Sequence, residues 1–220
     1  MLKPETFRVK IKSFQVNPTG LPAMEQRVAV EELDTNLFRA DPANLWTPFG
    51  ARGIFGGQVI GQALTAALRT VPPEFEVHSL HSSFLRPGDS SVPIYYYVHR
   101  VREGRSFATR HVRAQQRGKA IYVATTSFHR REQAALEHQA AFPANVPAPE
   151  ALLSDDQLVA RALASPRTPP RIKRFLRAKE AGASAAGGGA GFPLEIRRCD
   201  PQAATNSAAA AAVAHHAGGA

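Results

Sequence analysis

Phe55-Gly56-Gly57-Gln58-Val59-Ile60-Gly61-Gln62-Ala63-Leu64 opens a stretch that runs to Val71 and decides the fold. Apolar residues recur every four positions, and a second apolar row fills the neighbouring positions, which predicts a helix over residues 55–71. The helix ends at Pro72-Pro73, because proline cannot continue a helix. Its surface is apolar except for one narrow polar stripe, which consists of Gln58, Gln62, Thr65 and Arg69. Such a helix has to be covered by other elements on most of its surface.

Strand-like runs surround this helix in the sequence. One alternating run, 28–33, precedes it, and four follow it, at residues 76–85, 93–102, 106–116 and 120–129. The runs after the helix are separated by short turn signals: Arg86-Pro87-Gly88-Asp89, Glu103-Gly104-Arg105 and Arg117-Gly118-Lys119. Short connections predict an antiparallel meander with the order β-α-β-β-β-β. The predicted class is therefore α+β, with one helix wrapped by an antiparallel sheet, as in the hotdog architecture.

The composition limits the classes of protein. The 220 residues carry a formal net charge of +9 and contain one cysteine, Cys199, which fits a reducing, intracellular compartment. Basic residues are dense over 100–131 and 167–179, which fits either a phosphate-bearing ligand or a solvated surface. Nucleic-acid binding is disfavoured, because the aromatic stacking motifs of RNA-binding sheets are missing. The N-terminus lacks the apolar core of a secretory signal, and no apolar run reaches the length of a transmembrane segment.

The composition changes along the chain and predicts four segments. Residues 1–25 are expected to be an irregular extension, and 26–131 a complete hotdog domain. Residues 132–191 read as a linker with two short helices, one capped by Ser154 and one over 171–179, and 181–191 is expected to be flexible. Residues 192–220 begin a further strand without a partner and end in an alanine-rich tail that is expected to be disordered.

Few residues in this pattern carry chemistry. The sequence lacks a Gly-x-Ser-x-Gly elbow and a phosphate-cradling glycine loop. Gly56 and Gly57 leave amides accessible at the positive end of the helix dipole, or they only let the helix approach the sheet. Three residues apart on one strand, His78 and His81 are expected to point to opposite faces, so no metal site is expected. His81 either lines a polar site or is a core histidine, and Gln58 and Gln62 either orient a ligand or form an interface.

Four motifs in order resemble the type II acyl-CoA thioesterases. They are Leu37-Phe38-Arg39, the helix segment 55–63, Val77-His78-Ser79-Leu80-His81-Ser82-Ser83-Phe84-Leu85-Arg86-Pro87-Gly88-Asp89, and Gly104-Arg105-Ser106-Phe107-Ala108-Thr109-Arg110. The resemblance covers about residues 31–139 and continues more weakly to Arg198. It implies two hotdog domains in one chain that hydrolyse fatty acyl-CoA to a free fatty acid and CoA without a cofactor.

The family places its catalytic Asp, Ser or Thr, and Gln in the second hotdog. Here the second hotdog begins at Phe192 and stops within one strand, so no catalytic residue is carried over. The first-domain signature implies candidate acyl-CoA-binding residues: Gly56, Gly57, Gln58, His78, His81 and Arg86. The resemblance suggests a peroxisomal location, but the chain ends in His-His-Ala-Gly-Gly-Ala and lacks a Ser-Lys-Leu-like signal, which leaves the cytoplasm open.

Three functions remain open. The chain is an acyl-CoA thioesterase that truncation has impaired or inactivated, a non-catalytic hotdog that binds acyl-CoA or another subunit, or a truncated product without a function of its own. A single hotdog leaves an apolar sheet face and an edge exposed, so we expect a homo-oligomer or another hotdog subunit as partner.

Overall fold

The computed structural model describes residues 23–133, 136, 138–142, 146–185, 197 and 199. These residues belong to two compact units, one within residues 16–138 and one that includes residues 139–185. The first unit holds the sheet and the central helix, and the second holds two helices.

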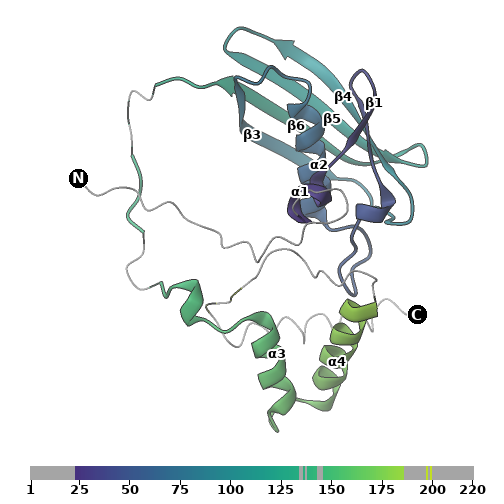
Figure 1. Ribbon diagram of the computed structural model, residues 1–220, viewed down its shortest axis with the longest axis vertical. Coiled ribbons are helices and arrows are strands. Elements are labelled where there is room, and N and C mark those ends of the chain that lie inside the picture. The colour runs from purple at the N-terminus through teal and green to yellow at the C-terminus, as the bar shows by residue number, and fades with distance from the viewer. Residues whose placement is uncertain are drawn as a thin grey trace. The chain divides into compact units, whose positions relative to one another are not determined.

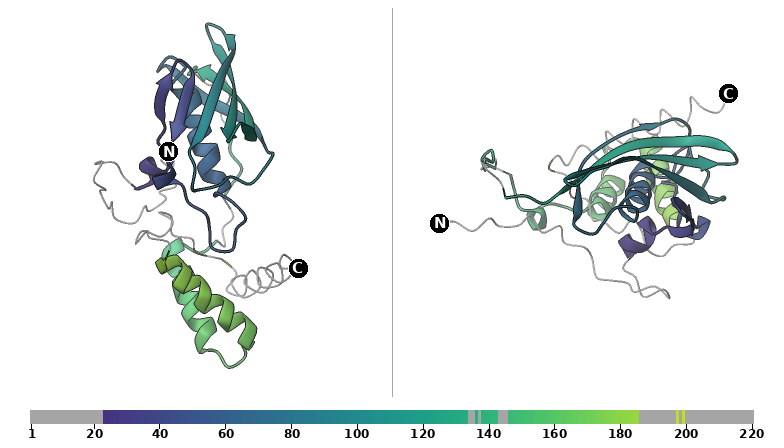
Figure 2. Two further views of the ribbon diagram at one scale, coloured as in Figure 1. Left: turned by 90° about the vertical axis from the view of Figure 1, so that its right-hand side faces the viewer. Right: turned by 90° about the horizontal axis from the view of Figure 1, so that it is seen from above.

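One antiparallel sheet packs against one helix in the first unit (Figure 1). The helix, α2, spans Gly56–Leu68. In the right-hand view of Figure 2 it lies along one face of the sheet. The six strands are β1 Glu31–Asp34, β2 Leu37–Ala40, β3 Phe75–Phe84, β4 Ile94–Glu103, β5 Phe107–Gln116 and β6 Lys119–Arg130. The hotdog fold and the α+β class predicted from the sequence are confirmed.

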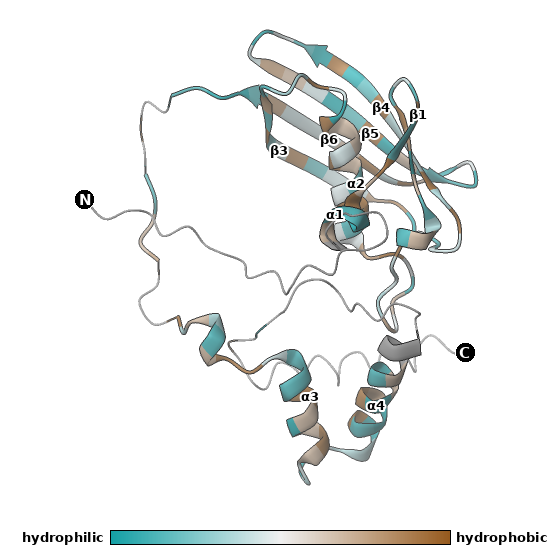
Figure 3. Cartoon of the chain, in the orientation of Figure 1, coloured by the Kyte–Doolittle hydropathy of each residue, from teal (hydrophilic) through white to brown (hydrophobic). Residues whose placement is uncertain are grey.

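The core lies between α2 and the sheet because both elements present apolar side chains there. Burial alternates along β5 and β6, so every second residue faces α2, and Figure 3 shows the matching changes of hydropathy along the strands. We call this side of the sheet the helix face and the other side the outer face. Small buried residues on α2 let it approach the sheet closely, while large side chains fill the helix face: Phe38, Ile94, Tyr96, Tyr122 and Phe128. Burying each of these stabilises the fold by about 1.5–3 kcal/mol.

The structure corrects the sequence expectations at the N-terminal end of this unit. Residues 23–25 are not an irregular extension, because they begin helix α1, Ala23–Val28. The predicted strand over 28–33 is instead β1, which starts at Glu31 and pairs with the unpredicted strand β2. Asn36, at φ 63°, makes the tight turn between them, since asparagine tolerates the left-handed region. A short 3₁₀ helix, η1 Pro42–Asn44, follows, capped by Asp41.

The predicted meander is correct for β4, β5 and β6 and wrong for β3. The strand order is β1-β2-β4-β5-β6-β3, so β3 pairs with β6 at the far edge of the sheet and not with β4. The segment from Leu85 to Pro93 therefore crosses the end of the sheet, and it is long enough to do so without forming a hairpin. Backbone amides of Leu85 and Arg86 donate to the carbonyl of Ile121 at 2.8 and 3.2 Å, which anchors the start of this crossover.

The second unit contains two helices and a small core. Helix α3, Asp155–Ala164, begins at Ser154, which accepts from the Gln157 amide in a capping box, as the sequence predicted. Helix α4, Pro170–Ala185, packs on α3 through Val159, Ala162, Ile172 and Leu176. A 3₁₀ helix, η2 Pro149–Ala151, precedes α3.

Two expectations for this unit are corrected. Residues 181–185 were expected to be flexible but continue α4, because alanine is a strong helix former; residues 186–191 lie outside the described part. The sequence predicts a strand from residue 192 that has no partner. In the structure, Arg197 forms an isolated antiparallel bridge with Ser154. The other residues of 192–220, except Cys199, lie outside the described part. None of the described helices has the length and apolar character that crossing a membrane requires.

Candidate functional site

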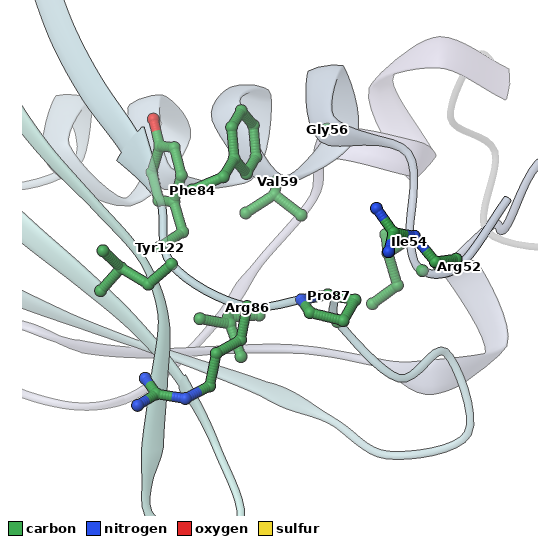
Figure 4. Close-up of a pocket in the computed structure, with 12 residues that line it drawn as sticks. Arg52, Ile54, Gly56, Val59, Phe84, Arg86, Pro87 and Tyr122 are labelled. Atoms are coloured by element: carbon green, nitrogen blue, oxygen red, sulfur yellow. The ribbon is translucent and has the colours of Figure 1, made fainter. Parts of the chain in front are cut away.

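A pocket of about 450 Å³ opens at the N-terminal end of α2 (Figure 4). Three segments form it: residues 52–59, where α2 begins; residues 84–88, where β3 ends; and Ile121 with Tyr122 on β6. Its walls are mainly apolar, with Ile54, Val59, Phe84, Leu85 and Ile121 among the lining residues. Such a pocket suits an apolar group whose polar end stays near the rim.

Two arginines belong to the lining, and they differ in what they do. The Arg86 guanidinium donates to the carbonyl of Ala120 at 2.7 Å and so fixes the crossover to the β5–β6 turn. Arg52 is exposed and forms no ion pair with the residues that the structure describes. Figure 4 shows Arg52 beside Ile54, on the side of the pocket opposite Phe84. The charge of Arg52 is therefore available to a negatively charged ligand, and Arg86 keeps N–H groups that its bond to Ala120 does not use.

The crossover that forms one wall of the pocket is held by a buried glutamine. The Gln116 side chain donates to the carbonyls of Asp89 and Val92 at 2.7 and 2.9 Å and accepts from the Asp89 amide at 2.8 Å. The Ile54 amide donates to the Gly88 carbonyl at 3.1 Å, which ties the crossover to the segment before α2. The backbone of the pocket is thus fixed from both sides.

No side chain caps the N-terminus of α2. The N-cap residue is Phe55, and the first turn contains no acidic residue. The positive end of the helix dipole therefore meets no acidic side chain from its own first turn. Gly56 lines the pocket, whereas the Cβ position of Gly57 lies against the Phe55 ring.

The polar stripe of α2 serves the fold. The Gln58 amide accepts from the Trp46 backbone at 3.0 Å and donates to the carbonyls of Arg27 and Asn44 at 2.9 and 2.6 Å. Gln62 donates to the same Arg27 carbonyl at 2.8 Å and accepts from the Tyr96 hydroxyl at 2.7 Å. These bonds join α2 to α1, to the loop before it and to β4. Both glutamines are buried and do not line the pocket.

His78 and His81 lie on the same face of β3, which corrects the expectation that they point to opposite faces. A bulge between Val77 and Ser79 inserts one residue and shifts the alternation. The His78 ring lies against Phe107 and His129 and 2.9 Å from the Ser127 hydroxyl, while His81 pairs with Thr125. All these neighbours occupy the outer face. Of the six candidate residues, the structure thus brings Gly56 and Arg86 to the pocket and places the histidines on the outer face.

The opposite end of α2 is closed by a buried arginine. Arg110, on the helix face of β5, donates to the hydroxyl and the carbonyl of Thr70 at 2.8 Å each and to the carbonyl of Arg102 at 3.1 Å. Its guanidinium also lies 2.8 Å from the Glu103 carboxylate. Burial lowers the pKa of Arg110, and the Glu103 charge partly offsets this.

Two buried tyrosines flank the site region. Burial raises the pKa of Tyr96 well above its usual value, so its hydroxyl stays protonated and donates to Gln62. Burial also raises the pKa of Tyr122, and the Ser82 hydroxyl opposes that shift. Both phenols are neutral at ordinary pH.

Of the twelve lining residues, the sequence singles out only Gly56 and Arg86 as candidates, and Arg52, Phe84 and Tyr122 are among those it misses. Arg52 sits in a loop without periodicity, so nothing in the pattern singled it out. Phe84 stands inside the motif 77–89 that carries the family resemblance, close to the candidate Arg86. Tyr122 alternates in step with the other buried residues of β6. This alternation indicates that its side chain lies on the helix face.

Comparison with known proteins agrees with this geometry. Residues 43–129, which include α2 and every lining residue of the pocket, match the model of the acyl-CoA thioesterase N-terminal domain. Acyl-coenzyme A thioesterase 8 of Mus musculus is 44% identical over 137 residues, which cover 62% of this chain and 42% of that protein. Peroxisomal acyl-coenzyme A thioester hydrolase 1 of Saccharomyces cerevisiae is 38% identical over 99 residues, 44% of this chain and 28% of that protein.

A solved structure gives the same result for the fold. The tesB protein of Mycobacterium avium subs paratuberculosis superposes with a TM-score of 0.51 at 35% identity and covers 59% of this chain and 48% of that one. One helix packed on an antiparallel sheet is the hotdog architecture. Residues 43–129 match the N-terminal domain of the acyl-CoA thioesterases, and over this part the chain is a relative of the type II acyl-CoA thioesterases. The chain spans about half the length, 42–51%, of the acyl-CoA thioesterases of mammals and Haemophilus influenzae that it matches.

Proposed function

We propose that this chain supplies the first hotdog of a thioesterase that hydrolyses fatty acyl-CoA to a free fatty acid and CoA. The observation that carries the proposal is the family match over 43–129, the segment that builds the pocket. In this proposal the acyl-CoA enters the pocket beside Gly56, with its phosphates near Arg52 and Arg86. A guanidinium is suited to phosphate because its N–H groups form charge-assisted hydrogen bonds. Gly57, Gln58, His78 and His81 are further candidates for acyl-CoA binding, as the family resemblance implies.

Hydrolysis needs more than this pocket provides. A water molecule that attacks a thioester carbonyl needs a base to take its proton and donors to stabilise the developing oxyanion. The residues that line the pocket include no carboxylate and no imidazole. In this proposal the base comes from a second hotdog, so the chain by itself is impaired or inactive.

The second hotdog, or a second copy of this chain, is proposed to pack along β3. This strand pairs with β6 and is the last in the strand order of the described sheet. Its side chains are largely exposed, including Val77 and Phe84, and Leu85 and Leu68 of α2 are exposed as well. An unpaired edge beside exposed apolar side chains favours association. Light scattering tests this, and a monodisperse monomer would contradict it.

The decisive assay measures the release of CoA from medium- and long-chain acyl-CoA, with a heat-denatured sample as the control. Turnover above the control supports an active chain. Absence of turnover together with calorimetric binding of a non-hydrolysable acyl-CoA is expected where the base lies in a second hotdog. It equally fits the second candidate, a non-catalytic acyl-CoA-binding module, which the lack of a base in the pocket supports. Absence of both would contradict the proposal.

We also propose that the protein is located in the peroxisome. This proposal rests on the family resemblance and on the name of the yeast relative. Fractionation of cells that express the full-length protein tests it, and recovery with the cytoplasmic fraction would contradict it.

A further inference from the structure

Phe84 is half-exposed although it forms part of the pocket wall. It is the last residue of β3, directly opposite Tyr122 on β6, and the two rings lie 5.1 Å apart. Tyr122 is fully buried, whereas 56% of Phe84 remains exposed. The phenylalanine ring is therefore supported from one side by the sheet and is partly open to solvent.

The ring of Phe84 also covers the first turn of α2. A Cβ atom at Gly56 would lie 2.9 Å from Cζ of Phe84, and its three closest contacts would all be atoms of that ring. Real Cβ atoms do not approach other atoms so closely, so any side chain at position 56 would displace the ring. The absence of a side chain at Gly56 thus makes room for the ring of Phe84. Figure 4 shows Phe84, Gly56 and Val59 together at this end of the pocket.

The pocket has an apolar end and a charged end. Phe84 stands at one side and Arg52 at the opposite side, with Ile54 and Val59 between them (Figure 4). Arg52 forms no ion pair with the described residues, so its charge is available to an anion. An extended molecule with a negatively charged head and an alkyl tail fits this arrangement, with its tail directed toward Phe84.

We propose that the Phe84 ring, seated on Gly56, is the end wall of this pocket and sets the length of the alkyl chain that the pocket accepts. The inference rests on the proposed function, because it takes the alkyl chain to be that of an acyl-CoA. Removing the ring lengthens the apolar pocket along the first turn of α2. Each additional methylene that the longer pocket buries strengthens binding about fourfold.

The test is calorimetric titration of the full chain with non-hydrolysable thioether analogues of acyl-CoA from octanoyl to palmitoyl. In Phe84→Ala the tightest-binding chain should be longer than in the unmodified protein by two or more methylenes, and Phe84→Trp should shift it to shorter chains. Phe107→Ala is the matched control, since Phe107 is 40% exposed but lies on the outer face. Its chain-length profile should equal that of the unmodified protein.

A double-mutant cycle tests the contact with Gly56 separately. Gly56→Ala should lower the melting temperature of the unmodified protein, because the new methyl group displaces the ring. In the Phe84→Ala background the same change should no longer lower the melting temperature, because alanine is otherwise favoured over glycine in a helix. Equal losses in both backgrounds would show that Gly56 is needed for another reason and would overturn the assignment of Phe84 as the ring seated there.

The outcomes separate this inference from the proposed function. If the unmodified protein binds the analogues but Phe84→Ala keeps the same preferred length, the inference fails and the proposed function stands. If the unmodified protein binds none of the chain lengths, the proposed function fails and the inference fails with it. Phe84→Leu, which keeps an apolar contact with Tyr122, serves if Phe84→Ala does not fold, and it should shift the preferred length in the same direction by less.

Discussion

The two ends of α2 are held in opposite ways. At the C-terminal end, Arg110 is fully buried, and its guanidinium donates to two groups of Thr70, to backbone carbonyls and to Glu103. At the N-terminal end, no side chain caps the helix, and Gly56 lies under the half-exposed ring of Phe84. One end is closed by a polar cluster around the buried Arg110, whereas the other opens into a pocket.

This difference shows how the fold separates stability from binding. A buried cation stays charged only where its donors are satisfied, so the Arg110 cluster specifies how α2 lies on β4 and β5. The open end is instead braced from the side by Gln58, which leaves the space in front of the helix free. Stability should therefore depend most on the closed end, and ligand binding most on the open one.

Arg110→Met should produce the largest loss of stability. Methionine is similar in length but leaves the Thr70 and Arg102 carbonyls and Glu103 without their donor. Leaving a buried polar group without its partner costs about 1–3 kcal/mol, and the hydroxyl and carbonyl of Thr70 and the carbonyl of Arg102 lose their donor together. Urea unfolding measures the change, with Arg113→Met on the outer face as the control at about 0.5 kcal/mol or less. Equal losses of unfolding free energy in Arg110→Met and Arg113→Met would contradict the stabilising role of the closed end of α2.

Gln58→Leu should cost less, because it removes the side brace of the open end without removing a charge. The Trp46 amide loses its acceptor, and the carbonyls of Arg27 and Asn44 lose a donor. Unsatisfied buried groups of this kind cost about 1–3 kcal/mol. Thermal unfolding measures the loss. Gln115→Leu is the control, since its side-chain oxygen is buried without a partner among the described residues, and a loss as large as that of Gln58→Leu would contradict the brace.

Gly53→Ala tests the backbone of the pocket. A Cβ atom there would meet the Gly88 carbonyl oxygen and the Pro87 Cβ at 2.9 Å each, and these atoms cannot move as a ring does. Overpacking of this type costs about 1–2 kcal/mol. We expect Gly53→Ala to weaken binding of the acyl-CoA analogue and to lower the melting temperature more than Gly56→Ala does. The reverse order would show that the ring of Phe84 is more rigid than the crossover.

The sequence predicted the closed parts of this unit better than the open ones. Helix α2 and the four strands after it were predicted to within three residues at each end, because buried elements carry strong periodicity. The position of β3 at the far edge was not predictable from that pattern, since periodicity shows which residues are strands but not which strands pair. The bulge after Val77 was missed for the same reason, and it moved His78 to the outer face.

The buried polar residues were the hardest to interpret. Gln58 and Gln62 were considered for ligand orientation or an interface, and the structure uses them to join elements of the fold. Arg110 was counted with the basic strand residues, although it shares the parity of Ala108, Val112 and Ala114 and so belongs to the helix face. Arg110 occupies a position where the alternation of β5 predicts a buried residue. A basic residue at such a position indicates a buried polar cluster. The pocket itself had no such signal, because loops without periodicity contribute much of its lining.

Asp89→Asn should have the smallest effect, confined to acid pH, and it concerns the crossover beside the open end. Hydrogen bonds from Ser91 hold the pKa of Asp89 below its usual value, and Arg117 adds to this. Because the pKa is lower in the folded state, the carboxylate stabilises the fold above its unfolded-state pKa. That contribution is lost as the pH falls through the folded-state pKa.

The unmodified protein should therefore lose more stability on acidification below about pH 4 than Asp89→Asn does. The measurement is the melting temperature as a function of pH, and the two curves should converge in strong acid. Ser91→Ala tests the same bond from the donor side and should flatten the acid limb in part. A parallel shift of the Asp89→Asn curve at every pH would mean that Asp89 holds the crossover through its shape and not through its charge.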